Sequence, residues 1–532
     1  MKRLWSLYVA FFVIAIGLAL ASPAHAATIA VSASAPDNTT LGNGCSIREA
    51  IDNANNDTAT HPDCIAGSGT DTISIPAATY NIATALPAVT TPIIVDGAGP
   101  DQTIIDGQNT GGFALFQGSS TVIRDMTLLR TDSTGLSITN GDAEIYNFEY
   151  DGTGLTTETS PIDYYISDNL DHSIIIDGVY LHDFEITHTI GLYGIGVDTG
   201  GSNNSTSTLR NITISNIRNL DLNASVGAIL IGNGTSGFEN GGIHNSVLEN
   251  ITIQGIYGVT QVVGLVVGTL TNTETASSNA TVRNITIQNI EASGGASRVA
   301  GMAVFSIATP GGNSTSQLNI QNSLTANLVT GGDKYTCFSQ LVGNGGTEAA
   351  TITSLGGNAA YDNSCVEMNQ PTDQLGIAGL ASTLGPLAVS NGALTPVIPL
   401  LAGSQAIDAG INTNCYATDQ RGIARPQGSK CDAGAYEFVA AVSTPTPAPT
   451  PAAGPGESLP RVGLIYVGMP LLLATCLMAA YVYYDYLRHK APLYAENPSV
   501  HYTFLHHLKV VTLPMFSYKV SIVVQKKEPW SG

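Results

Sequence analysis

Short apolar strands recur along the middle of the chain at a nearly constant interval. The segment LRNITISNI (209–217) returns as LENITIQGI (248–256) and VRNITIQNI (282–290), and more loosely as IDGVYLHDF (176–184). Successive copies begin 33, 39 and 34 residues apart, and each is followed by a second apolar run and a polar loop. Such a period in strand-forming units predicts a solenoid in which neighbouring repeats bury one another's faces.

Aligning the copies separates interior positions from surface positions. Two apolar columns lie two residues apart, on one side of a strand, and are predicted to form the interior. The first column contains Val179, Ile212, Ile251 and Ile285, and the second contains Leu181, Ile214, Ile253 and Ile287. The residues between the columns are predicted to point outward: Tyr180, Thr213, Thr252 and Thr286.

A further column predicts where each coil turns. It consists of Asp183, Asn216, Gly255 and Asn289. These residue types tolerate a left-handed backbone, so we interpret the column as a bend between two strands of a parallel β-helix. A fourth column alternates in charge: Asp177, Arg210, Glu249 and Arg283. It predicts a charge ladder between stacked coils, although accidental surface charges explain it equally well.

Composition agrees with a strand-rich protein. Only 11% of the residues are charged, 57 are Gly, and the formal net charge is −21. These values favour strands and turns over helices. An acidic body repels the phosphate backbone, so no nucleic-acid partner is expected.

Both ends of the chain predict its location. Residues 1–26 combine Lys2 and Arg3 with an apolar core and an Ala24-His25-Ala26 cleavage site, which indicates a secretory signal. The uncharged segment 462–484 spans roughly 34 Å as a helix, enough for a bilayer, although a buried globular helix is the alternative. The basic tail 485–532 then predicts a single-pass protein with an extracellular N-terminal part and a cytoplasmic C-terminus.

A Pro-rich segment precedes the predicted membrane helix. Residues 441–460 alternate Pro with Thr and Ala, which predicts an extended stalk. LPRVG (459–463) resembles the sortase signal LPxTG, but Val462 replaces the Thr at which a sortase cleaves. We therefore favour a retained membrane helix over sortase anchoring.

Cysteines and an N-terminal motif predict local structure. Three disulfides are predicted from proximity in an oxidising compartment: Cys45–Cys64, Cys337–Cys365 and Cys415–Cys431. In GCSIREAIDNANN (44–56), Ser46 and Glu49 have the spacing of a helix capping box. An apolar stripe follows at i, i+3, i+4 and i+7, formed by Ile47, Ala50, Ile51 and Ala54. We expect this helix to cover the open end of the first coil.

Two motifs resemble known families. CSIREAIDNANN (45–56) resembles the CSLREA-type N-terminus of bacterial surface proteins, and residues 403–438 resemble the choice-of-anchor Q domain. The resemblance implies a right-handed parallel β-helix at a bacterial cell surface, without an agreed enzymatic activity. The expected domains are a signal peptide (1–26), an N-terminal cap (27–70), a β-helix (71–382), a choice-of-anchor Q-like region (383–440), the stalk, the membrane helix and the tail.

Candidate chemistry is sparse. Parallel β-helices often carry polysaccharide lyases and glycosidases, and on this analogy the best constellation is His172, His182, Asp183, Glu185 and His188. Asp183 also fits the bend column, which gives it a structural role. The acidic stretch 141–152 lacks the spacing of a specific calcium loop, so we interpret it as a solvated loop. No cofactor is expected, although calcium is possible in principle.

Three functions are compatible with these features. The leading hypothesis is a membrane-anchored adhesin whose β-helix binds surface glycans or another cell's surface. The alternatives are a polysaccharide lyase or glycosidase on the same scaffold and a structural coat protein. Enzymatic activity is the less favoured of these readings.

Overall fold

The computed structural model describes residues 26–440, except 34, 111, 132–133, 156–159, 188–191, 202–203, 235–240, 296 and 391–394. All of them belong to one compact unit, which ends at Val442. The predicted signal peptide (apart from residue 26), stalk, membrane helix and tail lie outside the described residues. Within the described part, the helices are α2 (Ile47–Asn56) and the short 3-10 turn η1 (Leu380–Thr383), and no helix is long and apolar enough to cross a membrane.

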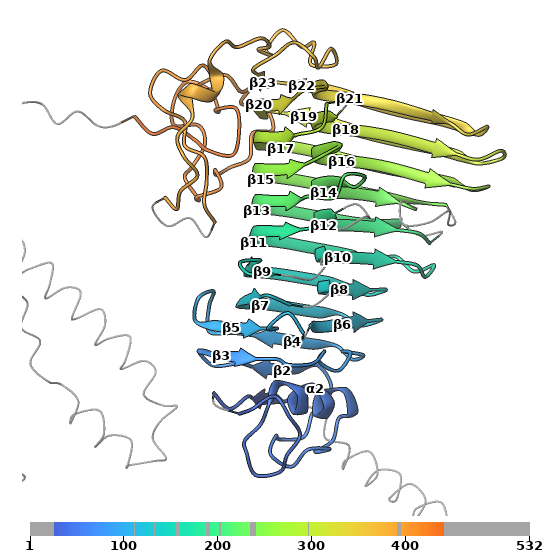
Figure 1. Cartoon of the computed structure of the whole chain (residues 1–532), viewed down its shortest axis with the longest axis vertical. Helices are drawn as coiled ribbons and strands as arrows, with labels where there is room; N and C mark the ends of the chain where they lie inside the picture. The colour runs from blue at the N-terminus through green and yellow to red at the C-terminus, as the bar shows by residue number, and fades with distance from the viewer. Residues whose placement is uncertain are drawn as a thin grey trace, which may run out of the picture. The chain divides into compact units, whose positions relative to one another are not determined.

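The described strands form two parallel sheets that wind into a right-handed parallel β-helix (Figure 1). The path of the larger sheet contains β1 (Thr28–Ala30), β2 (Asp71–Ser74), β4 (Ile93–Asp96), β7 (Thr121–Leu129), β9 (Ala143–Asp151), β11 (Ser173–Ile186), β13 (Asn204–Asn219), β15 (Gly242–Gly258), β17 (Thr275–Ala292), β19 (Asn313–Gln321) and β22 (Thr347–Gly356). Off this path lie β3 (Ala78–Asn81), β5 (Thr103–Asp106), β20 (Leu324–Thr330) and β23 (Ala359–Ala360). The smaller sheet contains β6 (Phe113–Gln117), β8 (Thr134–Thr139), β10 (Ser160–Ile166), β12 (Leu192–Thr199), β14 (Ser225–Asn233), β16 (Gln261–Thr271), β18 (Arg298–Ala308) and β21 (Asp333–Gly343). Because β1 pairs with β2, the parallel stack begins within the segment assigned to the cap.

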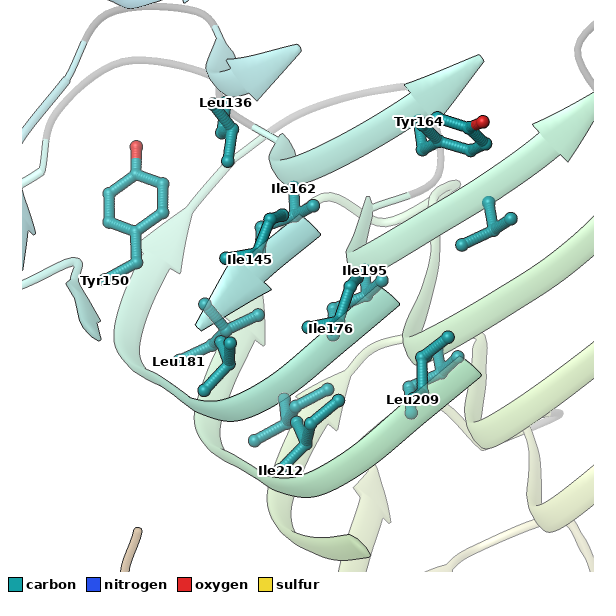
Figure 2. Packing of buried hydrophobic residues seen from close by; sticks show 14 of the residues in the cluster. Leu136, Ile145, Tyr150, Ile162, Tyr164, Ile176, Leu181, Ile195, Leu209 and Ile212 are labelled. Atoms are coloured by element: carbon teal, nitrogen blue, oxygen red, sulfur yellow. The ribbon is translucent and has the colours of Figure 1, made fainter. Parts of the chain in front are cut away.

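The predicted interior columns form the core. Ile212 pairs with Ile251 and Ile251 with Ile285, and all three are completely buried. Figure 2 shows Leu181, Leu209 and Ile212 filling the space that the coils enclose. Burying one such side chain contributes about 1.5–3 kcal/mol, so the stacked columns provide much of the driving force for folding.

The four longest strands, β11, β13, β15 and β17, each bend twice. The predicted bend column is confirmed, with φ of 62° at Asp183, 53° at Asn216, 69° at Gly255 and 57° at Asn289. A second left-handed column, which the sequence pattern did not reveal, has φ of 70° at Gly178, 53° at Asn211, 55° at Asn250 and 56° at Asn284. The asparagine of the repeated NIT motif therefore turns the chain. We call the outward-facing residues between the two bends the middle face.

The middle face corrects one expectation. Thr213, Thr252 and Thr286 point away from the interior as predicted, yet all three are buried. The C-terminal region covers them: the Thr252 hydroxyl donates to Gln420 Oε1 at 2.7 Å, and the Ala435 amide donates to Thr286 Oγ1 at 2.9 Å. Residues of the segment 383–440 are thus packed on the side of the β-helix.

Electrostatic and covalent links agree with several sequence predictions. Arg210 pairs with Asp177 at 3.3 Å and Arg283 with Glu249 at 2.8 Å, so the alternating column does form ion pairs between coils. Partly buried cross-strand pairs of this kind contribute about 0.2–1 kcal/mol each. The structure also contains the three predicted disulfides.

The N-terminal motif forms the predicted capped helix. The Ser46 side chain accepts from the Glu49 amide while Glu49 accepts from the Ser46 amide, which is a complete capping box. Ile47 and Ile51 are buried at the end of the coil stack beside β2, where α2 lies in Figure 1. The helix covers apolar interior that would otherwise face water.

Replacing both Ile47 and Ile51 with Asp should prevent stable folding, because two carboxylates would be buried without partners at a cost of several kcal/mol. The measurement is the melting temperature and the soluble yield of residues 27–440. Thr60→Asp, on an exposed position after the helix, is the matched control and should melt like the wild type. A double variant with an unchanged melting temperature would contradict the role of the helix as a cap.

A buried histidine predicts how stability depends on pH. His244 is completely buried, with Ser205 Oγ 2.8 Å from Nδ1 and Ser207 Oγ 3.1 Å from Nε2. Burial lowers the pKa of His244 to about 4. As the pH falls from about 6.5 to about 4, the unfolded chain takes up this proton before the folded chain does, which destabilises the fold by roughly 3 kcal/mol.

The check is a comparison of melting temperatures of the wild type and His244→Gln between about pH 7 and pH 4. Burial raises the pKa of Asp432 to about 6, which has the opposite effect on stability in acid. The difference between the two proteins therefore reports His244, and the wild type should lose more stability than the variant. Parallel curves would refute this assignment.

Candidate functional site

Side chains of three adjacent coils line up on the middle face next to the part that the C-terminal region covers. In the stack, Thr127 of β7 pairs with Glu149 of β9, and Glu149 pairs with Tyr180 of β11. Two residues further along the same strands, Asp151 pairs with His182. Because successive coils are about 4.8 Å apart, the side chains of these residues are brought within hydrogen-bonding range of one another.

His182 is held between two carboxylates. Its Nε2 lies 3.0 Å from Glu149 Oε1, and its Nδ1 lies 2.8 Å from Asp183 Oδ2. Ionised carboxylates only accept hydrogen bonds, so both ring nitrogens must carry hydrogen, and the network assigns His182 as an imidazolium. The Tyr180 ring stacks on the imidazole at 4.1 Å between centroids.

The pKa values follow from this geometry. Burial alone would lower the pKa of His182, but the hydrogen bonds that it donates to Glu149 and Asp183 outweigh burial and raise the pKa above its ordinary value. Burial raises the pKa of the Glu149 carboxyl, and hydrogen bonds from His182 and Thr127 more than offset this, so its net pKa is lowered. The pKa of Asp183 is likewise lowered by Asn216 and His182 against the effect of burial.

A fourth carboxyl, that of Asp101, belongs to the same cluster, and its pKa is raised rather than lowered. The Asp101 amide donates to Thr127 Oγ1 at 3.0 Å, and the Thr127 hydroxyl donates to Glu149 Oε2 at 2.8 Å. The negative charge of Glu149 and burial raise the pKa of Asp101. Two neighbouring carboxyls with diverging pKa values can hold one proton between them. We call Asp101, Glu149, Asp151, His182 and Asp183 the carboxylate cluster.

The sequence candidates separate in the structure. His182 and Asp183 belong to the cluster. Glu185 follows the bend and pairs with Arg218 at 3.1 Å. His172 bonds to Asp168 at 3.1 Å near the start of β11, ten residues before His182. His188 lies outside the described residues, so its place relative to the cluster stays a prediction.

Several site residues were not predicted. Asp101, Thr127, Glu149 and Asp151 were missed, and the stretch 141–152, interpreted as a solvated loop, instead contains strand β9. The sequence does contain a pattern that indicates two of these residues. Glu149 and Asp151 alternate with Phe148 and Tyr150, which are buried. That alternation places both carboxylates on the outward side of a strand. It was overlooked because this coil does not carry the NIT motif from which the others were aligned.

A metal ion is one conceivable occupant. Ligand atoms of Asp151, His182 and Asp183 lie within 4.8 Å of one another. Imidazole ligates a metal through an unprotonated nitrogen, whereas the two carboxylates bonded to His182 favour its charged form. The arrangement therefore favours hydrogen bonding to a polar ligand over metal coordination by His182.

Comparisons with known proteins give matches among solved structures and none by sequence. No family model matches the chain and no curated protein matches it, so the two terminal resemblances stay predictions. Among solved structures, pectate lyase Pel9A is similar over 78% of this chain and 97% of its own, with 12% identity and a TM-score of 0.28. The catalytic unit of the GH87 α-1,3-glucanase from Streptomyces thermodiastaticus strain HF3-3 covers 65% of this chain and 71% of its own, with 12% identity and a TM-score of 0.23. At these TM-scores the likeness carries no argument about activity.

The charge state of His182 can be measured directly. Its imidazole should titrate above the ordinary histidine range in NMR spectra of residues 27–440, and Glu149→Gln should lower that pKa by removing a charged acceptor. Since the folded-state pKa is raised, the stabilisation by this cluster is present below the ordinary pKa and is lost as the pH rises through the folded value. Titration of His182 at or below its ordinary pKa would contradict the imidazolium assignment.

Proposed function

We propose that the protein is a cell-surface glycan-binding protein and that the carboxylate cluster is its binding site. The observation that carries this proposal is the position of the cluster. It occupies a part of the middle face where the Glu149, Asp151 and Asp183 side chains are 17%, 29% and 43% exposed, whereas Thr213, Thr252 and Thr286 of the next coils are covered by the C-terminal region. Partly desolvated carboxylates are strong acceptors for sugar hydroxyls, and Tyr180 supplies a ring beside them.

Charge selects the class of glycan. Glu149, Asp151 and Asp183 surround the single positive charge of His182, so the cluster is negative overall. The negative cluster would repel the carboxylate of a uronic acid that bound against it. Neutral sugars carry no such charge and can donate hydroxyl hydrogens to every carboxylate. We therefore favour neutral glycans. The secretory signal and membrane anchor, predicted from the sequence, would place this site outside the cell.

Glycoside hydrolysis is a second candidate, favoured by the opposite pKa shifts of Asp101 and Glu149. Glycosidases use one protonated and one ionised carboxyl. In this reading, Asp101 would protonate the leaving oxygen, and Asp151 or Asp183 would act as the second carboxylate. A lyase reaction is less favoured, because the hydrogen bonds to Glu149 and Asp183 raise the pKa of His182 and so weaken it as a proton acceptor.

Binding is tested with residues 27–440 on an array of neutral and acidic glycans. Wild-type protein should bind neutral glycans, and Glu149→Gln should weaken binding about tenfold or more, because a charge-assisted hydrogen bond contributes roughly 1.5–3 kcal/mol. Glu185→Gln is the matched control, since Glu185 lies on the same strand outside the cluster. Equal binding by both variants, or binding to acidic glycans alone, would refute the proposal.

Product analysis separates binding from hydrolysis. The same neutral glycans are incubated with wild type and with Asp101→Asn, and the release of reducing ends is followed. Turnover that disappears in Asp101→Asn would establish the second candidate, and binding without turnover would remove it.

A further inference from the structure

The C-terminal region covers the middle face on one side of the carboxylate cluster. Thr213 directly follows Tyr180 in the stack, and it is 0% exposed. Its hydroxyl donates to the Pro396 carbonyl, and Gln420 Nε2 donates to Thr213 Oγ1 at 2.7 Å. One coil beyond the cluster, the position of the middle face that follows Tyr180 is therefore covered by Pro396 and Gln420.

The cover is anchored over further coils. Gln420 is itself buried and also accepts from Thr252, while Asn284 of β17 donates to the Asp432 carbonyl at 3.3 Å. A segment held to three successive coils through buried hydrogen bonds is not readily displaced. We therefore treat the C-terminal region as a fixed boundary of the site.

Asp101 limits the other side. Its amide donates to Thr127 Oγ1, and Thr127 is only 4% exposed. Between the two covers, the side chains of Glu149, Asp151 and Asp183 are 17%, 29% and 43% exposed. The open stretch thus spans two coils, β9 and β11, or about 10 Å along the axis at the spacing of stacked strands.

We propose that this site accepts the end of a glycan chain rather than its interior. A glycan chain lying along this stretch would meet Pro396 or Asp101 after about 10 Å. If the interior of a long glycan chain lay along the stacked carboxylates, the chain would have to continue through the space that Pro396 or Asp101 occupies. This inference rests on the proposed function, since it concerns the same cluster.

The test varies chain length in the wild-type protein. A neutral glucan, a mannan and a xylan are each used as oligosaccharides of increasing length and as the polymer, and affinity is expressed per mole of chains. Each chain has one end of each kind whatever its length. Recognition of ends therefore predicts a Kd per chain that stays within about twofold beyond the shortest oligosaccharides.

Each outcome is informative. A Kd per chain that keeps falling in proportion to length would show that interior units bind, and would overturn this inference while leaving the proposed function intact. If none of the three glycans binds at any length and no glycan on the array binds either, the proposed function is refuted, and this inference is refuted with it. Binding of ends that is lost in Glu149→Gln and kept in Glu185→Gln would place the recognised end at the cluster.

Discussion

The register of left-handed bends is the constraint on which the rest of the structure depends. Each long strand turns at two such residues, and the bends of neighbouring coils lie in register, so that inward and outward positions repeat from coil to coil. A left-handed backbone is unfavourable for most residues, and Asn, Asp and Gly adopt it at the lowest cost. Side chains at these positions also bond along the stack: Asn327 donates to Asn289 at 2.5 Å and Asn250 to Asn211 at 3.3 Å. A bend displaced by one residue would move the isoleucine columns from the interior to water.

The same register explains why one part of the middle face is covered by the C-terminal region while another part forms the carboxylate cluster. The middle face presents one outward residue per coil at each of two positions. In β13, β15 and β17 the first position is threonine, a small hydroxyl that the C-terminal region can pack against and bond through Gln420 and Ala435. In β9 and β11 the equivalent positions are Glu149 and Tyr180, which are larger and bond within the cluster. The change of residue type along one column coincides with the border between covered and open surface.

The sequence alone predicted what depends on local pattern. Periodicity identified the coils and their interior columns, the S-x-x-E spacing identified the capping box, and proximity identified the disulfides. The burial of Thr213 could not be predicted, because its partner Pro396 lies far away along the chain and a threonine between two isoleucines looks like a surface residue. The bend at the asparagine of NIT could not be predicted either, because an asparagine before an apolar strand looks like a surface residue, whereas Asn250 and Asn284 are buried at a left-handed bend. Three of the five cluster residues were missed, and Asp101 is among them because it precedes a short strand and reaches Glu149 only through the stacking of coils.

Asp183 shows that the structural and functional interpretations of a residue need not compete. The bend requires only tolerance of a left-handed backbone, and its equivalents Asn216, Gly255 and Asn289 meet that requirement without a charge. A carboxylate at this position is therefore not explained by the bend. It is explained by His182, whose Nδ1 lies 2.8 Å from Asp183 Oδ2, while the other carboxylate oxygen accepts from Asn216. The bend fixes the direction of the side chain, and Asn216 of the next coil stabilises its negative charge. The charged pair therefore forms one coil before Thr213, where the cover of the C-terminal region begins.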